Sequence, residues 1–347
     1  MSRRLPGGRA RGWGAAAAAA TVAAAVLAGC GAPGTSTTTT GGPSTTGSTT
    51  TSAPAGSSTT TTSSPGTWSA PTTVTTGAAV DQVSCATATT CTAVAGTDAY
   101  RWDGSTWSGP TGLGFAATAA PTSVACLATT LCVAVAPSGQ AATWNGTAWL
   151  APVTVSTNQG LGAVGCAGAS FCVTIDGVGD SYRFDGSGWS GSAGAWGAAD
   201  DISCATPAFC VAAEGAPSMW DGESWTQPQG TDPTGQVNAV SCPSATFCMA
   251  VDTTGHALSW NGSGWSVPQV VMAGAGPVLG STRQGLTAVS CPTATDCVAV
   301  GANGKAYRWD GTAWSSAESV STSALTSVSC VAGSCVATDA TGRAYRG

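Results

Sequence analysis

The sequence predicts an all-β fold, a seven-bladed β-propeller of four-stranded antiparallel blades whose ring is closed by a strand from near the amino terminus. A unit of roughly forty residues recurs seven times, and each copy carries two cysteines. The last copy stops at Tyr345-Arg346-Gly347 without a final strand, and a matching segment stands earlier at Thr67-Trp68-Ser69-Ala70-Pro71. A chain that begins with the end of its last repeat can close into a ring, so these ends favour a propeller.

The leading cysteine of each copy marks the period. Successive leading cysteines are 41, 40, 38, 38, 49 and 39 residues apart, close to the ~40–45 residues of a four-stranded propeller blade. One copy shows four short segments rich in β-branched or aromatic residues, at 288–291, 297–300, 306–309 and 314–315. Turn residues separate them, which is typical of a small antiparallel meander. Stacked meanders share a core, either in a closed ring or in an open stack, which remains the alternative.

Ring closure requires a specific neighbour for the last blade. Its third strand is expected at Arg343-Ala344-Tyr345, and its missing fourth strand at Trp68-Ser69. These two segments should therefore lie side by side and remove an open sheet edge.

The first 29 residues form an expected signal segment. Four arginines precede an uncharged run, 14–28, that is too short for a transmembrane helix. The run ends in Leu27-Ala28-Gly29-Cys30, which resembles the lipobox of bacterial lipoproteins. That resemblance implies lipid modification of Cys30 and anchoring at the outer face of the cytoplasmic membrane. The alternative is a plain secretory signal, and Ser2-Arg3-Arg4 also resembles a twin-arginine export signal.

The composition changes sharply after the signal. Residues 31–65 are Thr, Ser, Gly and Pro with a few Ala, and they hold no charged or aromatic side chain. Such a segment has nothing to bury, so residues 30–65 are predicted to be a disordered linker. Residues 66–347 are predicted to form the propeller.

Charge restricts the partners. Removing residues 1–29 removes four of the 11 basic side chains, which leaves 7 against 17 acidic ones and changes the net charge from −6 to −10. A charge of this sign argues against nucleic acid as a partner and against direct docking on anionic lipid.

Fourteen cysteines remain beside Cys30, and they fall into seven close pairs. Each pair ends a first strand and begins a second, so a hairpin would bring the two sulfurs together. In an oxidising compartment such pairs become disulfides. Metal binding and redox catalysis are the alternatives, but the pairs lie on different blades and the chain has one histidine. We expect no metal and no cofactor. The pairs are Cys85 with Cys91, Cys126 with Cys132, Cys166 with Cys172, Cys204 with Cys210, Cys242 with Cys248, Cys291 with Cys297, and Cys330 with Cys335.

A second motif joins the third and fourth strands of six copies, as in Trp102-Asp103-Gly104-Ser105-Thr106-Trp107. The Asp-Gly or Asn-Gly step supplies the positive φ of a tight hairpin, and the two aromatic residues would pack within and between blades. The turn resembles the Asp-box repeat of sialidase-like propellers, although Asp and Gly are adjacent here. Within that family the Asp-box is structural. Carbohydrate binding by the aromatic pairs is the alternative to a core role.

A sialidase-like active site implies an arginine cluster, a tyrosine nucleophile and acidic partners. The four tyrosines all stand at one repeat position, each followed by arginine. This periodic placement indicates a structural role in the blades. The single histidine, His256, follows Gly255 and is expected at a solvated turn. No catalytic residue is therefore predicted.

Acidic residues recur four positions after the second cysteine, where the turn between second and third strands begins. A ring of such carboxylates at the channel mouth could bind a cation or sugar hydroxyls. The alternative is an ordinary type I turn with Asp at its first position. The residues are Asp176, Glu214, Asp252 and Asp339.

Breaks in the repeat are the other pointer to function. The separation of 49 marks an insertion at about 270–285, with Met272 and Arg283. Trp196 stands outside the repeat register, beside Asp200 and Asp201. Insertions in repeat proteins map to loops on one face, often the binding face. Trp196 could contact a sugar or a peptide, or pack on its own blade.

These observations predict a lipid-anchored, extracytoplasmic propeller that serves as a non-catalytic binding or scaffold module for a glycan or an envelope protein. The site is expected on the face that carries Trp196, the 270–285 insertion and the acidic turns. The alternatives are a carbohydrate-active enzyme with a degenerate sialidase-like site and a structural part of an envelope complex.

Overall fold

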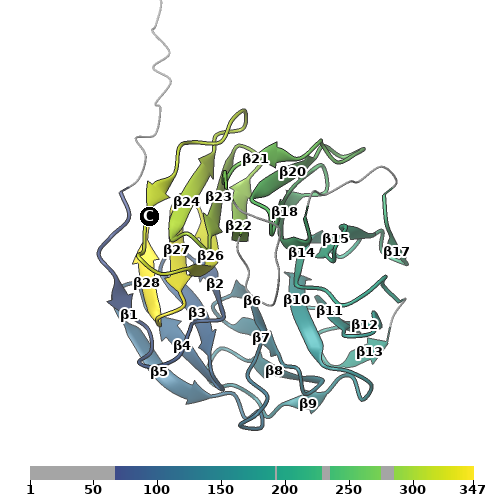
Figure 1. Ribbon diagram of the computed structural model, residues 1–347. Coiled ribbons are helices and arrows are strands. Elements are labelled where there is room, and N and C mark those ends of the chain that lie inside the picture. Colours follow the sequence, from purple (N-terminus) through teal and green to yellow (C-terminus); the bar gives the residue numbers. More distant parts are fainter. Residues whose placement is uncertain (1–66, 192–193, 229–234, 275–284) are drawn as a thin grey trace, which may run out of the picture. The chain divides into compact units, whose positions relative to one another are not determined.

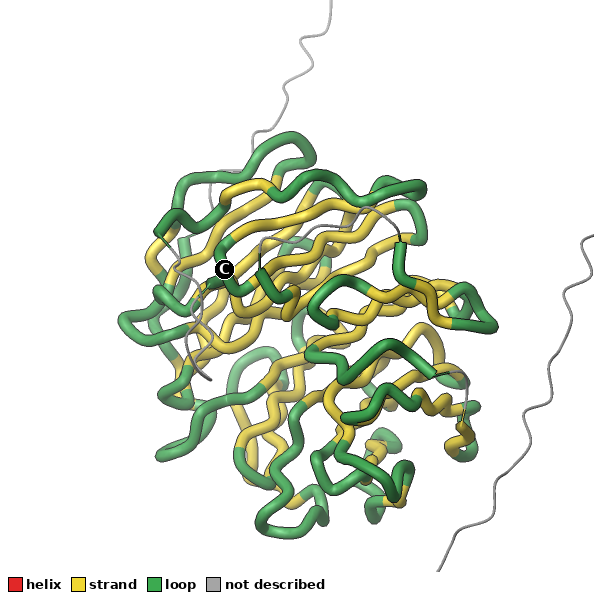
Figure 2. Tube along the Cα trace, turned by 45° about the vertical axis from the view of Figure 1, so that its right-hand side comes forward, coloured by secondary structure: helices red, strands yellow, loops and turns green. Residues whose placement is uncertain are grey.

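The computed structural model describes residues 67–191, 194–228, 235–274 and 285–347. In these ranges the chain forms seven four-stranded antiparallel sheets without a helix, arranged as blades around a common centre (Figure 1). The tube view shows the strands of each blade running together, with loops at their ends (Figure 2). The predicted signal segment, the linker and the lipid attachment at Cys30 lie outside the described residues. The described part of the chain contains no helix with the length and apolar character needed to cross a membrane.

Each blade is a meander whose strands run outward from the centre. The first, innermost strands are β2 (Gln82–Thr87), β6 (Ser123–Ala128), β10 (Leu161–Gly168), β14 (Asp201–Thr206), β18 (Val237–Ser244), β22 (Leu286–Thr293) and β26 (Leu325–Val331). The second strands are β3 (Thr90–Ala95), β7 (Leu131–Val135), β11 (Phe171–Asp176), β15 (Phe209–Ala213), β19 (Phe247–Asp252), β23 (Asp296–Gly301) and β27 (Ser334–Asp339).

The outer two strands of each blade are shorter. The third strands are β4 (Asp98–Trp102), β8 (Gln140–Trp144), β12 (Ser181–Phe184), β16 (Ser218–Trp220), β20 (His256–Trp260), β24 (Lys305–Trp309) and β28 (Arg343–Arg346). The fourth strands are β5 (Trp107–Gly112), β9 (Val153–Thr154), β13 (Trp189–Gly191), β17 (Trp225–Thr226), β21 (Gln269–Val270), β25 (Glu318–Ser319) and β1 (Thr72–Thr73).

The predicted ring closure is confirmed. Strand β1 is the fourth strand of the seventh blade and pairs with β28, with Thr72 opposite Ala344 and Thr73 opposite Arg343. The contact continues to Ser69, whose N–H donates to the Arg346 carbonyl at 2.7 Å. The paired strand thus begins four residues beyond the predicted Trp68, and the innermost strands β26 and β2 are neighbours across the junction.

Trp68 and Glu318 fasten this junction from the outside. The indole Nε1 of Trp68 donates to Oε2 of Glu318 in the sixth blade at 3.1 Å. Arg308 completes the contact: its Nε lies 3.2 Å from Oε1 of Glu318, and its guanidinium carbon lies 5.5 Å from the centre of the Trp68 ring. The closing segment is therefore held by an ion pair and a cation–π contact as well as by backbone pairing.

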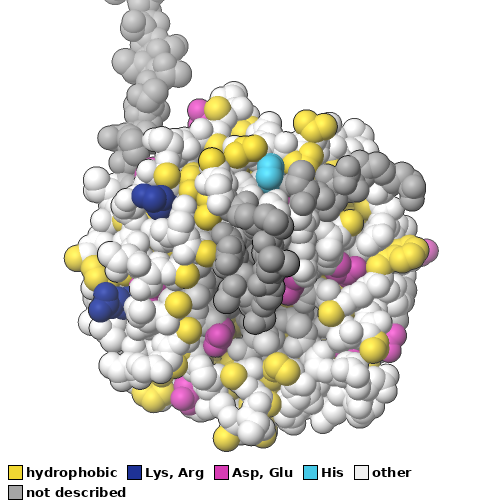
Figure 3. Space-filling model, viewed as in Figure 1, with side chains coloured by type: hydrophobic (Ala, Val, Ile, Leu, Met, Phe, Trp, Pro, Cys, Tyr) yellow, Lys and Arg dark blue, Asp and Glu magenta, His cyan; other side chains and the backbone are white. Residues whose placement is uncertain are grey.

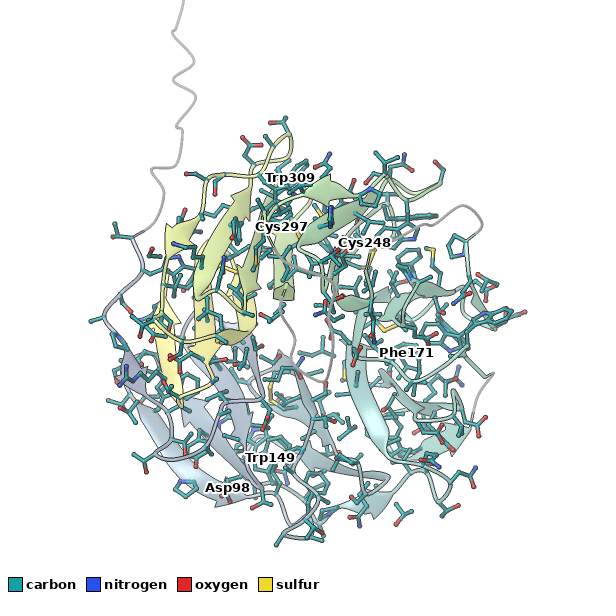
Figure 4. All side chains as sticks on the ribbon, viewed as in Figure 1. Asp98, Trp149, Phe171, Cys248, Cys297 and Trp309 are labelled. Carbon is teal, nitrogen blue, oxygen red and sulfur yellow. A yellow bond between two sulfur atoms is a disulfide. The ribbon has the colours of Figure 1, made fainter. Side chains whose placement is uncertain are left out.

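All seven predicted disulfides are present, each joining the first and second strands of a blade. The Cα atoms of a pair are 3.9 to 4.1 Å apart, as expected for residues that face each other across a hairpin. Figure 4 labels Cys248 and Cys297 and draws the sulfur–sulfur bonds in yellow. Seven disulfides in one chain indicate folding in an oxidising, extracytoplasmic compartment. The bonds join Cys85 with Cys91, Cys126 with Cys132, Cys166 with Cys172, Cys204 with Cys210, Cys242 with Cys248, Cys291 with Cys297, and Cys330 with Cys335.

The hydrophobic core lies between the blades. Each of the seven core clusters combines side chains from two neighbouring blades, as where Val251 of the fifth blade packs with Leu286 and Val289 of the sixth. Small residues dominate: many of the fully buried positions are Ala, Val or Cys. A single blade therefore has no complete core, and the stability of each depends on its neighbours.

The serine before the leading cysteine ties blades together, a role that the sequence did not reveal. In five seams the cysteine N–H of one blade donates at 2.9 Å to the serine Oγ of the preceding blade. The bonded pairs are Cys85 with Ser329, Cys126 with Ser84, Cys242 with Ser203, Cys291 with Ser241, and Cys330 with Ser290. Where Ala125 and Gly165 replace this serine, the bond is missing. Each such bond contributes about 1 kcal/mol.

Candidate functional site

The mouth of the central channel is built by one residue from each blade. All seven residues that stand four positions before a leading cysteine line a cavity of about 450 Å³. The cavity lies on the face that carries the turns between second and third strands and the connections between blades. A second cavity of about 210 Å³ lies deeper between the innermost strands. The seven residues are Asp81, Thr122, Gly162, Asp200, Asn238, Thr287 and Thr326.

Negative charge is concentrated at this mouth. Asp81, Asp200 and Asp201 line the cavity, and its lining contains no lysine or arginine among the described residues. Figure 3 shows acidic side chains near the centre of one face, with basic side chains near the edge. Asp81 is exposed to solvent at the mouth, but partial enclosure by the surrounding strands raises its pKa to about 6, and a hydrogen bond from the Gly96 backbone opposes the rise.

Uncharged polar groups complete the mouth and brace it. Thr287 Oγ1 donates to the Leu325 carbonyl at 2.8 Å, and Asn238 Nδ2 donates to the Leu286 carbonyl at 2.9 Å. Each bond joins two blades. The other amide atom of Asn238, Oδ1, is buried and has no hydrogen-bond donor within the described ranges. It is thus an acceptor at the cavity that a ligand could satisfy.

The disulfide cysteines have a structural role and lie outside the mouth. Three leading cysteines, Cys126, Cys166 and Cys204, line the deeper cavity with their strands. The second cysteines line neither cavity, because they sit on the second strands and are buried against the neighbouring blade. All fourteen are bonded in pairs, so none offers a free thiol for metal binding or redox chemistry. The second cysteines are Cys91, Cys132, Cys172, Cys210, Cys248, Cys297 and Cys335.

The carboxylates predicted at the acidic turns serve mainly to stabilise their own turns. Asp176, Asp252 and Asp339 are fully buried. One carboxylate oxygen of each accepts backbone N–H groups from its own turn, for example from Thr341 and Arg343 at 2.8 and 3.1 Å in the case of Asp339.

Asp176 and Asp339 also accept the hydroxyl of a third-strand tyrosine, Tyr182 and Tyr345 respectively. Burial alone would raise the pKa of Asp339, but hydrogen bonds from Thr341, Tyr345 and Ser321 outweigh it and lower the pKa. These carboxylates therefore bind the backbone of their own turns and do not line the cavity.

Glu214 differs from the other three. It is buried, its Oε2 accepts a hydrogen bond from Ser218 at 2.8 Å, and its Oε1 lacks a well-aligned donor in the described structure. Burial raises the pKa of Glu214 to about 7, and the Ser218 hydroxyl and the Trp196 backbone moderate that rise. Glu214 therefore changes protonation near neutral pH beneath the loop that carries Trp196.

Glu214 should make stability depend on pH. A carboxyl whose pKa is higher in the folded than in the unfolded chain stabilises the fold below its unfolded pKa, and this contribution is lost as the pH rises through the folded pKa. For Glu214 the window runs from 4.5 to about 7. We expect Glu214→Gln to raise the free energy of unfolding at pH 8 by roughly 2–3 kcal/mol and to leave it little changed at pH 4.

Urea unfolding at a series of pH values measures this difference. Glu223→Gln is the matched control, since Glu223 is an exposed carboxylate in the same blade. If Glu214→Gln and Glu223→Gln give the same curve between pH 4 and 8, the account of Glu214 is wrong.

The other predicted site residues are spread along this face. Trp196 is 67% exposed, in the connection from the third to the fourth blade. Met272, in the insertion, is buried in the core between the fifth and sixth blades. Its N–H donates to the Gly255 carbonyl at 2.9 Å. Arg283 lies outside the described residues. His256 lies beside the turn of Asp252 and contacts the Thr254 hydroxyl at 2.9 Å.

The tyrosines and arginines of the third strands occupy blade seams. Tyr100 Oη donates to Thr75 Oγ1 at 3.1 Å, and Tyr307 Oη accepts from Asn303 at 2.9 Å. Arg101 stacks over Trp144 of the next blade at 4.3 Å, and Arg346 stacks over Trp102 at 5.1 Å. The two arginine contacts join neighbouring blades, and the structural role of both residue types agrees with their periodic placement.

The aromatic turn has the predicted geometry. Gly104 has a φ of 100°, and Asp103 Oδ1 accepts hydrogen bonds from the backbone of Thr106 and Ser105 at 2.8 Å. These hydrogen bonds lower the pKa of Asp103 to about 2. The rings of Trp102 and Trp107 lie 5.7 Å apart, and the other five turns repeat the pair at 5.4 to 6.0 Å.

Asp81 and Asn238 were not recognised in the sequence as site residues. The signal that could have found them is register: each stands four residues before a leading cysteine, on the strand nearest the axis. Within the described ranges, no three His, Cys, Asp or Glu side chains come close enough to hold a metal ion.

No model of a known protein family matches the chain, and no curated protein matches its sequence. Several solved structures are similar in fold. YCF48 bound to D1 peptide matches with a TM-score of 0.63 and 16% identity over 81% of this chain and 96% of that one. The WD40 β-propeller domain of Doa1 matches with a TM-score of 0.65 and 10% sequence identity, over 81% of this chain and 96% of that one. U3-55K matches with a TM-score of 0.66 and 10% sequence identity, over 80% of this chain and 97% of that one. These likenesses show that the chain has the β-propeller fold.

Proposed function

We propose that this protein is an exported, lipid-anchored binding module that holds an extended, positively charged segment of a partner protein at the channel mouth, without catalysing a reaction. The observation that carries the proposal is the mouth itself. Seven strands converge there on a cavity of about 450 Å³ with three aspartates in its lining. A low-dielectric recess lined by one sign of charge attracts ligands of the opposite sign.

Hydrogen-bonding groups around the carboxylates suit a peptide. Asn238 Oδ1 is a buried acceptor without a donor within the described ranges, and a peptide N–H or a lysine ammonium could satisfy it. Trp196 and Val178 are 67% and 59% exposed, in loops of the third and fourth blades. They offer apolar area beside the charged mouth, a combination usual at peptide-binding surfaces.

Export and anchoring are supported from the sequence and the disulfides. Seven disulfides need an oxidising compartment, and the segment Leu27-Ala28-Gly29-Cys30 resembles a lipobox. Lipid on Cys30 would tether the propeller through the 30–65 linker. YCF48, a propeller of similar fold, was solved bound to a peptide, and this supports a peptide as the class of ligand.

Calorimetric titration of the full chain tests the proposal. The probes are a ten-residue peptide of alternating Lys and Ser and its Glu/Ser counterpart. We expect the basic peptide to bind and the acidic one not to bind. The double change Asp81→Asn with Asp200→Asn should weaken binding roughly 5- to 30-fold. Binding should also weaken as the pH falls below 6, because the pKa of Asp81 is about 6.

A matched control separates local from overall charge. Asp103→Asn with Asp185→Asn removes the same two negative charges at aromatic turns, where Asn145 and Asn261 stand in other blades. This control should bind the basic peptide like the unchanged protein. Equal losses in both double variants would mean that net charge alone attracts the peptide, and the proposal would be wrong.

A sialidase-like carbohydrate-active enzyme is the second candidate, favoured by the Asp-box-like turn. Release of sugar from a reporter glycoside, lost on Asp81→Asn with Asp200→Asn, would support it. Binding of a glycan array at the mouth without sugar release would instead identify a glycan as the ligand of a non-catalytic module.

A further inference from the structure

A groove of about 540 Å³ lies in the seam between the second and third blades, away from the channel mouth. The third and fourth strands of the second blade form one side with Thr143 and Val153, and the segment between these strands adds Leu150. The aromatic turn of the third blade forms the other side, with Phe184 and Trp189. The groove lies toward the face opposite the mouth, because it includes residues of the first-to-second-strand turn, such as Ala169.

Three departures from the repeat meet in this groove. At the position of Thr143, four of the seven blades have arginine. At the position of Leu150, the other six blades have serine or threonine. At the position of Phe184, the five other blades with a complete aromatic turn have tryptophan. Because three of its lining residues differ from the usual residues of the repeat, this groove is distinct from the equivalent seams between other blades.

In equivalent seams between other blades an arginine side chain fills this space. In the first seam Arg101 places its guanidinium 4.3 Å from the centre of the Trp144 ring. It also donates to the Thr129 carbonyl at 3.5 Å. Arg346 and Arg308 cover Trp102 and Trp68 at 5.1 and 5.5 Å. Thr143 is too short to reach Phe184 in this way, and Val133 opposite it on β7 adds little length.

The fifth blade shows the contrast. Ser259 stands at the arginine position there, but its cross-strand neighbour is the longer Met249, which packs in the core shared with Trp309. In the fourth blade Met219 itself packs with Trp260. The second blade has neither device.

The carbonyl of Ala169 lacks an indole donor that its counterparts in four blades have; the first blade also lacks the bond, because Trp102 Nε1 has no partner in the described structure. The indole N–H of Trp144 donates to the Thr129 carbonyl at 3.1 Å, and Trp220, Trp260 and Trp309 make the same bond in their blades. Phe184 has no N–H, so Ala169 receives no such bond. The groove therefore offers a backbone acceptor beside the half-buried ring of Trp189 and the edge of Phe184, which is 7% exposed, at the place where the first seam binds a guanidinium.

Leu150 replaces a hydrogen-bonding serine with an exposed apolar side chain. The serine hydroxyl at this position accepts the third-strand N–H in several blades, as Ser315 does from Arg308 at 3.0 Å. Leu150 cannot do so, and it is 49% exposed at the rim beside Val153, which is 52% exposed. An apolar rim around an aromatic floor suits the methylene stem of a long cationic side chain.

We propose that this groove binds an arginine side chain of a partner protein, whose guanidinium takes the place that Arg101 occupies in the first seam. The guanidinium lies over Phe184 and Trp189 and donates to the Ala169 carbonyl, and its stem contacts Leu150. The net charge of −10 calculated for residues 30–347 favours a cationic ligand. This site is independent of the channel mouth, so each can fail without the other.

The test is methyl NMR of the full chain with labelled leucines. The probes are Nα-acetyl-arginine amide and Nα-acetyl-citrulline amide, which has nearly the same shape without the charge. The arginine probe should shift the methyl signals of Leu131 and Leu150, which line the groove, and leave those of Leu113 and Leu258 unchanged. The citrulline probe should bind roughly 3- to 30-fold more weakly, the range of a cation–π contact.

Thr143→Arg restores the sibling residue and should abolish binding by filling the groove. Ser259→Arg makes the same change in the fifth blade and should leave binding unaffected. If Thr143→Arg fails to form its seven disulfides, Leu150→Ser takes its place and should weaken binding severalfold. Equal binding of citrulline and arginine, or binding retained in the folded Thr143→Arg variant, would overturn the proposal.

Discussion

Replacing Trp68 with alanine should lower the melting temperature by ~5–15 °C, the largest effect expected from a single side chain of this protein. Trp68 lies in the segment that completes the seventh blade, where its indole N–H donates to Glu318 and its ring lies under Arg308. It also packs against the core shared by the sixth and seventh blades. Its loss removes contacts on both sides of the ring junction at once.

The physical reason is that the ring closes through few strand bonds. Strand β1 contains two residues, Thr72–Thr73, so side chains carry much of the junction. A melting curve followed by circular dichroism measures the effect. Trp196→Ala is the control, because Trp196 is exposed in a loop and should change the melting temperature little. If Trp68→Ala melts together with the control, the ring does not depend on this contact.

Reduction of the disulfides should have the second large effect. Each bridge closes a hairpin loop with a sequence separation of 6, or 5 in the last blade, which limits the entropic contribution to ~2 kcal/mol per bridge. Seven such contributions together are comparable to the whole net stability of about 5–15 kcal/mol usual for a folded protein. We therefore expect the chain to unfold in strong reductant at temperatures where the oxidised protein is native.

Urea unfolding with and without reductant measures this dependence. Replacing one pair, Cys242 and Cys248, by alanine should cost about 2 kcal/mol and leave the other six bridges intact. That variant distinguishes the gradual loss of bridges from a specific role of one blade. An unfolding midpoint that is unchanged by full reduction would show that the small apolar cores between blades suffice without bridges.

Much of the fold could be predicted because the same pattern of strands and turns recurs seven times in the sequence. The cysteine pairs predicted the hairpin between the first and second strands of each blade, and Asp103-Gly104 and its equivalents predicted the hairpin between the third and fourth. The unfinished last copy, ending at Gly347, predicted the closure with the segment around Trp68. Strand pairing within a blade is local in sequence, so a single chain is enough to reveal it.

Contacts between blades could not be predicted in the same way. Ser84 reaches the N–H of Cys126 in the next blade, and Arg101 reaches Trp144, across about forty residues of sequence. Periodicity marks such residues as equivalent without showing which neighbour they contact. The face of the channel mouth was predicted, but its lining residues Asp81 and Asn238 were missed for a related reason, since they come together only when the ring closes.

The acidic turns show a further limit of sequence reading. Asp176 and Asp339 end the second strands on the expected face, yet their carboxylates bind their own turns and a tyrosine hydroxyl. Sequence places the residue at the turn but does not decide whether its side chain faces a ligand or the backbone. Glu214, longer by one methylene, has a buried Oε1 without a well-aligned donor in the described structure and retains a raised pKa.

A cross-strand cysteine pair tests the closed ring most directly. Thr73 faces Arg343 in the pairing of β1 with β28, next to the pair in which Val74 donates to Gly342. Opposite residues of that kind are close enough for a disulfide. Peptide mapping of Thr73→Cys with Arg343→Cys should recover a bond between positions 73 and 343 beside the seven native bridges. Recovery of both new cysteines as free thiols, with the native bridges intact, would contradict the ring and with it the channel mouth.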